Sequence, residues 1–171
     1  MARDTFFKNT LGQEPWELRG ANDARVTALA TRATTLEARG QLGYVEFGTS
    51  DQNGIGGTDT DITALSLPVT ASATATHRLR LSYVLDVRTG TTDDEVIISF
   101  KEGGTALKFG FHTPGPATRI VTVTASRVLL AAGGAHTYKL TAKRGAGAGT
   151  IDIVGTLGNT NYFMVEDLGA T

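Results

Sequence analysis

A chain of 171 residues is long enough for one medium-sized domain with a short extension, and such a domain can bury a core without disulfides. The absence of cysteine excludes thiol catalysis and thiolate metal sites, and a formal net charge of −1 gives no electrostatic reason to expect nucleic acid as a partner. No apolar run approaches the length of a membrane span, and the first residues lack the continuous apolar stretch of a signal peptide. We therefore expect a protein that is made in the cytoplasm and does not insert into a membrane.

The first segment, residues 1–20, carries large apolar side chains that follow neither a helical nor a strand period. They are Phe6, Phe7, Leu11, Trp16 and Leu18. Apolar residues without a period rarely form a stable element alone, so we expect an extended arm that docks on another surface. A disordered leader, or an arm folded back on its own domain, is the alternative.

Residues 21–40 predict a helix, with Asn22 or Asp23 as its cap, an interior rich in Ala, Leu, Arg and Glu, and Gly40 at its end. An a/d seam runs along it, formed by Val26, Leu29, Ala33 and Leu36, with Arg32 at a g position and Glu37 at the following e position. Because the chain offers no other helix for this seam, we expect a parallel, trimeric coiled coil between copies of the chain. A single amphipathic helix lying on the following domain is the alternative, since two heptads are short for a coiled coil.

From residue 41 onward the pattern favours short strands. Apolar and polar side chains alternate over residues 77–87, with Val84 as the exception, and the alternation recurs at 96–100, 107–111 and 138–142. Turn residues rich in glycine and proline separate these segments. Further strands are expected at 42–47, 62–67, 118–125, 150–155 and 161–167. Eight to ten short strands at regular spacing predict a mainly β protein whose head, residues 41–171, is a β-sandwich or jelly roll.

The last expected strand differs from the others because it is apolar on both faces, at Tyr162, Phe163, Met164 and Val165. A strand of this kind lies either in the centre of a sheet or at a contact between subunits. We interpret it as support for burial between subunits near the C-terminus.

Residues that could carry catalysis or hold a metal do not converge. The three histidines, His77, His112 and His136, fall in or beside different strands, with no pair at metal-ligand spacing. The acidic clusters at 59–61 and 93–95 could hold a hard cation, but they lack the spacing of a calcium loop and fall at predicted turns. The glycine-rich segment 143–149 has strands on both flanks, so we interpret it as a flexible hairpin tip and not as a phosphate loop. We predict no cofactor, no metal and no enzymatic activity.

Carbohydrate binding by a sandwich needs exposed aromatic side chains. The alternation places Phe111 and Tyr138 on core faces, and Leu107 and Phe109 share the face of Phe111. Loop aromatics are nearly absent, so the sequence gives specific sugar binding no support.

Three stretches resemble a module frequent in tailed phages of actinobacteria: residues 77–83, His-Arg-Leu-Arg-Leu-Ser-Tyr; residues 133–142, Gly-Gly-Ala-His-Thr-Tyr-Lys-Leu-Thr-Ala; and residues 165–169, Val-Glu-Asp-Leu-Gly. The resemblance covers about residues 21–171. It implies a virion component, either a capsid decoration or head-fibre protein or a minor tail protein, and a trimeric jelly-roll head of the tumour-necrosis-factor and complement type.

One short arm, two heptads and one head suit a homotrimeric decoration protein that is clamped by its arm to the outside of the capsid. Its partner would then be the major capsid protein. The alternative is a minor tail protein, an adhesin with tail proteins or a host cell-surface glycan as its partner.

Overall fold

The computed structural model describes residues 23–29, 40–71, 75–113, 118–156 and 160–171. The chain divides into two compact units, residues 1–38 and 39–171. The described part of the first unit is one helical segment, residues 23–29. Ten strands make up the described part of the second unit: β1 (Gly40–Glu46), β2 (Gln52–Ile55), β3 (Thr60–Ala71), β4 (His77–Thr89), β5 (Val96–Glu102), β6 (Thr105–His112), β7 (Ile120–Ala131), β8 (Gly134–Arg144), β9 (Ile151–Ile153) and β10 (Tyr162–Ala170). No helix among the described residues has the length and apolar content needed to cross a membrane.

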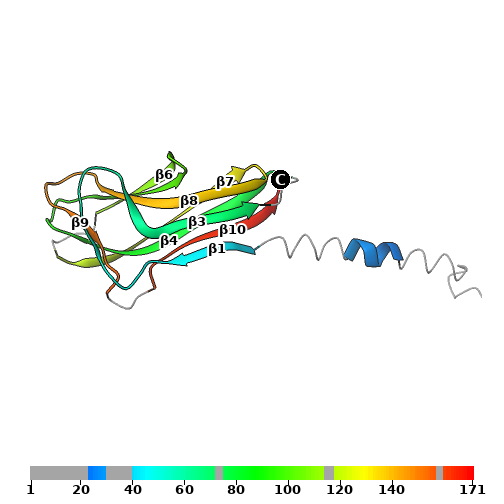
Figure 1. Cartoon of the computed structure of the whole chain (residues 1–171), viewed down its shortest axis with the longest axis horizontal. Helices are drawn as coiled ribbons and strands as arrows, with labels where there is room; N and C mark the ends of the chain where they lie inside the picture. The colour runs from blue at the N-terminus through cyan, green and yellow to red at the C-terminus, as the bar shows by residue number, and fades with distance from the viewer. Residues whose placement is uncertain (1–22, 30–39, 72–74, 114–117, 157–159) are drawn as a thin grey trace, which may run out of the picture. The chain divides into compact units, whose positions relative to one another are not determined.

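The strands form two antiparallel layers (Figure 1). In the first layer, sheet A, β7 pairs along one edge of the central strand β4. The other edge of β4 is shared, because β10 pairs with residues 77–84 and β9 with residues 87–89. β1 extends the sheet beyond β10, and β2 extends it beyond β9. The second layer, sheet B, has the order β3-β8-β5-β6.

Neighbouring strands are mostly distant in sequence, and consecutive strands such as β3 and β4 lie in opposite sheets. Repeated crossing between two sheets in this way defines a jelly-roll sandwich. The predicted mainly β class and sandwich architecture are therefore confirmed.

The core lies between the sheets and is filled by every second side chain of the paired strands. In β4 these are Leu79, Leu81, Tyr83, Leu85 and Val87, all fully buried. Sheet B contributes the predicted inner residues of β5, and β10 contributes Phe163 and Val165. The alternation read from the sequence over residues 77–87 is thus the inward and outward alternation of a sandwich strand.

Two expectations about individual strands need correction. β2 was not predicted, because Gln52, Asn53 and Gly54 show no apolar alternation, and the segment becomes a strand by pairing with β9. Asp86 falls on the polar face of β4 but is buried, where its carboxylate accepts a hydrogen bond from the Thr122 hydroxyl at 2.5 Å.

The strand expected at 107–111 is present as β6, but Phe109 does not lie on the core face that was predicted for it. Phe109 pairs with Ser99 on the outer side of sheet B and is 52% exposed. Phe100 and Ile98 of β5 point into the core. Their partners in β6 are Lys108 and Gly110, respectively. An irregular register near Lys108 leaves Leu107 packed against the core, whereas the side chain of Phe111 lies outside the described residues. The apolar period therefore predicted the strand, and the pairing register decided its face.

Candidate functional surfaces

The predicted acidic clusters are used within the fold. The Asp59 carboxylate forms an ion pair with Lys101 at 2.8 Å, and Asp61 forms one with Lys139 at 2.8 Å. The described residues contain no group of three metal-ligating side chains. The cation site considered from the sequence is therefore not supported by the described part of the chain.

The three histidines lie far apart in the pairing scheme, and each faces its own partner: His77 with Asp167 at 2.7 Å, His112 with the Tyr83 hydroxyl at 2.8 Å, and His136 with Glu102 at 2.6 Å. Burial lowers the pKa of His112, whereas the hydrogen bond to the carboxylate raises the pKa of His136. Each histidine thus joins two strands, which is a structural role.

The glycine-rich segment before β9 is docked, which corrects its interpretation as a flexible tip. The Gly149 amide donates to the buried Asp94 carboxylate at 2.9 Å, and the Gly145 amide donates to the Glu95 carbonyl at 2.8 Å. Burial by itself would raise the pKa of Asp94, but hydrogen bonds from the Thr91 and Gly149 amides outweigh it and lower that pKa. The Gly149 amide is already bonded to a carboxylate and the Gly145 amide to a carbonyl, so neither amide is available to bind an anion.

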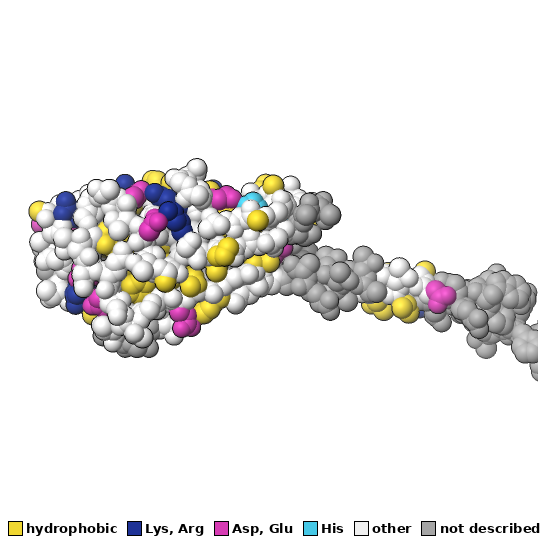
Figure 2. Space-filling model, viewed as in Figure 1, with side chains coloured by type: hydrophobic (Ala, Val, Ile, Leu, Met, Phe, Trp, Pro, Cys, Tyr) yellow, Lys and Arg dark blue, Asp and Glu magenta, His cyan; other side chains and the backbone are white. Residues whose placement is uncertain are grey.

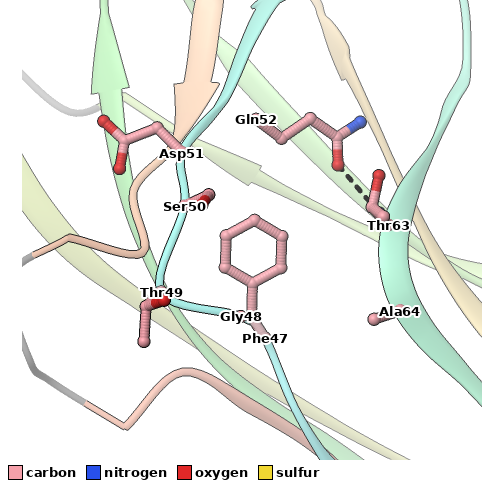
Figure 3. Close-up of a pocket in the computed structure, with 8 residues that line it drawn as sticks. All are labelled: Phe47, Gly48, Thr49, Ser50, Asp51, Gln52, Thr63 and Ala64. Carbon is pink, nitrogen blue, oxygen red and sulfur yellow. Dashed lines mark hydrogen bonds between the residues drawn. The ribbon is translucent and has the colours of Figure 1, made fainter.

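A cavity of about 450 Å³ lies between the β1–β2 connection and β3 (Figure 3). Its lining consists of one aromatic ring and small polar residues: Phe47, Gly48, Thr49, Ser50, Asp51, Gln52, Thr63 and Ala64. In Figure 3 the Phe47 ring stands between the two walls. Ala64 has a φ of 65°, and it lies in the stretch of β3 where the pairing with β8 is irregular, between Asp61 and Ser66.

The strongest polar groups of this cavity are occupied by the fold. The Gln52 amide donates to the Asp61 carbonyl at 2.9 Å and accepts from the Thr63 amide at 2.7 Å. One Asp51 carboxylate oxygen accepts from the Gly155 amide at 2.9 Å and from Thr156 at 3.0 Å. These bonds join β2 to β3, and they join the β1–β2 connection to the segment that follows β9.

The outer face of sheet A carries an apolar patch where a solvated sheet would be polar. It is formed by Tyr44, Val84, Tyr162 and Met164, which we call the sheet A patch. Tyr44 pairs with Met164, and Tyr162 pairs with Val84, so the four side chains adjoin across three strands. The two tyrosine rings lie 5.5 Å apart, and Tyr44 is 39% exposed. An ion pair between Arg80 and Glu166 at 2.7 Å borders the patch.

The patch continues toward the edge strand β7. Ser126 and Thr124 pair with Ser82 and Val84, and the exposed Val128 follows on the same face. Uncharged side chains thus extend the patch to the edge strand β7. A surface of this composition is typical of a protein–protein contact.

The described helix carries a second unpartnered apolar surface. Val26 and Leu29, two of the predicted seam residues, are 64% and 63% exposed, and Figure 2 shows apolar side chains at the surface of this segment. The other seam residues, Ala33 and Leu36 with Arg32 and Glu37, lie outside the described residues. So do the arm residues Phe6, Phe7, Leu11, Trp16 and Leu18.

No protein-family model matches the chain, and no curated protein matches it. Similar solved structures include Eiger TNF from S. frugiperda, at 8% identity and a TM-score of 0.48 over 78% of this chain and 96% of that chain. A carbohydrate-binding module of a Cellvibrio mixtus lichenase has 14% identity and a TM-score of 0.34 over 74% and 97%. A family 35 carbohydrate-binding module from Clostridium thermocellum has 14% identity and a TM-score of 0.37 over 72% and 97%. Likenesses at this level concern β-sandwich architecture and carry no information about a ligand of this chain.

Sequence reasoning found part of the sheet A patch and missed the rest. The two-faced apolar pattern of β10 pointed to Tyr162 and Met164, and Val84 was the single break in the alternation of β4. Tyr44 and the outward-facing Phe109 gave no signal, because their faces depend on which strands they pair with.

Proposed function

We propose that this chain is a non-enzymatic structural module that assembles as a homotrimer and is displayed on the outside of a phage capsid. The observation that carries the self-association is the sheet A patch. Four adjoining apolar side chains on a sheet face gain free energy when a like surface covers them, at about 25 cal/mol per Å² of apolar area. Within the described residues of the head, Tyr44 is exposed, and Val84, Tyr162 and Met164 are half-buried.

The helical segment supports the same conclusion from an independent surface. Val26 and Leu29 are three residues apart, so they lie on one face of the helix, and both are exposed. Continuation of this seam through Ala33 and Leu36 would give a short parallel coiled coil that adds to the contact made by the heads. Two weak contacts on one chain reinforce each other, because the second forms within an assembly already held by the first.

The virion location and the major capsid protein as partner rest on the resemblance of residues 77–83, 133–142 and 165–169 to phage modules. In this proposal the arm, residues 1–20, attaches the trimer by burying its aromatic side chains in the capsid surface. Trp and Phe are suited to this because large side chains that fill pockets dominate the binding energy of interfaces.

The test is to place a charge within the sheet A patch and measure the mass of the full chain by light scattering. Met164→Glu should raise the protein concentration at which the trimer forms by at least tenfold, because a carboxylate in an apolar contact would be buried without a partner. Thr70→Glu is the matched control, since Thr70 is exposed on the outer side of β3, and it should leave the mass unchanged. A Met164→Glu protein with the mass of the unmodified trimer would contradict the proposal.

The alternative function, a minor tail adhesin that binds host cell-surface carbohydrate, is favoured by one specific feature. Sheet B exposes an aromatic ring beside polar side chains on its outer face.

A further inference from the structure

The outer face of sheet B presents an aromatic ring to solvent. Phe109 is the most exposed aromatic side chain among the described residues, because its pairing with Ser99 turns it away from the core. Beside it lies a cavity of about 230 Å³, lined by Asp59, Ile97, Ser99, Ala106, Phe109 and Lys143. Figure 2 shows basic and acidic side chains lying side by side on the head.

One polar residue that lines this cavity, Ser99, is itself buried, at 4% exposure. Ser99 pairs directly with Thr141, so the two hydroxyl side chains adjoin on the outer face. Thr141 is only 2% exposed, and its hydroxyl has no hydrogen-bond partner among the described residues. Thr141 does not line the cavity, so the polar side chains that a ligand there can reach are those of Ser99, Asp59 and Lys143.

The lysines around the cavity differ in whether they form ion pairs. Lys101 and Lys139 are held by Asp59 and Asp61 at 2.8 Å each. Lys143, which lines the cavity, forms no ion pair within the described part of the chain. The Lys143 side chain therefore lines the same cavity as the exposed Phe109 ring and the Asp59 carboxylate.

We infer that this face carries a saccharide-binding site centred on Phe109, which takes one pyranose ring of a polysaccharide. The apolar C–H side of a sugar ring packs on the Phe109 ring, and the sugar hydroxyls face Ser99, Asp59 and Lys143. Such sites pair an apolar surface with a few placed polar groups, as here. Lys143 further favours a ring that bears a carboxylate, through a charge-assisted hydrogen bond.

The site differs from the cavity around Phe47. There the amide and carboxylate side chains, Gln52 and Asp51, are consumed by bonds to the backbone and to Thr156. Beside Phe109, the lining residue Lys143 forms no ion pair within the described part of the chain. The site also belongs to one chain, so it goes beyond the proposed self-association and does not require it.

The experiment is affinity electrophoresis of the full chain in gels that contain one polysaccharide each. The neutral gels hold laminarin, xylan, galactomannan or arabinogalactan, and the acidic gels hold alginate or polygalacturonate. We expect retardation in at least one gel, a loss of affinity of at least tenfold in Phe109→Ala and of at least threefold in Lys143→Gln. Retardation by the acidic gels alone identifies a carboxylate-bearing ring, and retardation by the neutral gels identifies a neutral one.

Val128→Ala is the matched control, because Val128 is an exposed apolar residue of the other sheet and should leave retardation unchanged. No retardation in any of the six gels would overturn the inference, and so would a Phe109→Ala protein that is retarded like the unmodified chain. Light scattering on the same samples keeps the two proposals apart. A monomer that binds the polysaccharide contradicts the trimer and supports the saccharide site. A trimer that is never retarded supports the trimer and contradicts the saccharide site.

Discussion

Replacement of Gly147 by alanine tests whether the glycine-rich segment is a docked part of the head. Gly147 has a φ of 89°, which an L side chain rarely adopts, and an added Cβ would lie 2.7 Å from the Asp94 Cα. The backbone conformation alone costs about 1–2 kcal/mol for alanine. The added carbon also displaces Asp94, whose bond to the Gly149 amide contributes about 1.5–3 kcal/mol as a charged hydrogen bond. We therefore expect Gly147→Ala to lower the free energy of unfolding by about 2–5 kcal/mol, and the sum is not strictly additive.

The assay is urea denaturation followed by far-UV circular dichroism at one fixed protomer concentration, because association adds to apparent stability. Gly104→Ala is the matched control, since a Cβ there meets nothing within 4 Å and its φ is not in the left-handed region. It should change stability by no more than about 0.5–1 kcal/mol. Equal effects of the two alanines would refute the docking of the segment, and would restore its interpretation as a free hairpin tip.

Other consequences of the structure can be measured with the same purified protein. Leu81→Ala should lower the free energy of unfolding by about 2–5 kcal/mol because Leu81 is fully buried. Arg80→Ala removes a solvent-exposed ion pair and should lower it by no more than about 1 kcal/mol. Equal losses in urea melts would show that the assignment of the two faces is wrong. Asp94, whose pKa is lowered in the fold, should stabilise the head above the ordinary carboxyl pKa of about 4 and lose that contribution as pH falls. Asp94→Asn should therefore flatten the acid limb of a stability–pH curve, and an unchanged limb would contradict the assignment. Deletion of residues 1–20 should leave a folded trimer that no longer co-sediments with particles stripped of the protein, and Trp16→Ala should weaken co-sedimentation; a truncated chain that binds as well as the full one would place attachment elsewhere.

The core of the head could be predicted from the sequence because it depends on local alternation. In β4, Leu79, Leu81 and Tyr83 alternate with polar residues over a long stretch, and the period of two has only one physical solution, a strand with one face buried. Val84 broke that pattern for a reason that the pairing later explains, since it lies in the sheet A patch.

What could not be predicted depends on contacts between distant segments. Phe109 lies outward because β6 pairs with β5 in one register, and a shift by one residue would have turned it inward. The docking of Gly149 on Asp94 joins residues that are 55 positions apart, so the glycine-rich composition alone suggested flexibility. Asp86 is a polar residue of the alternating stretch 77–87, but it is buried and accepts a hydrogen bond from Thr122 in another strand, which the alternation alone does not reveal.

The central claim is that copies of this chain cover the sheet A patch on one another. Sedimentation equilibrium of the full chain over a series of micromolar concentrations measures this most directly. The account predicts a single species with a mass near three times the 18.0 kDa of the chain, which Met164→Glu converts to monomers while Thr70→Glu does not. A mass of 18.0 kDa for the unmodified chain across the series would contradict it.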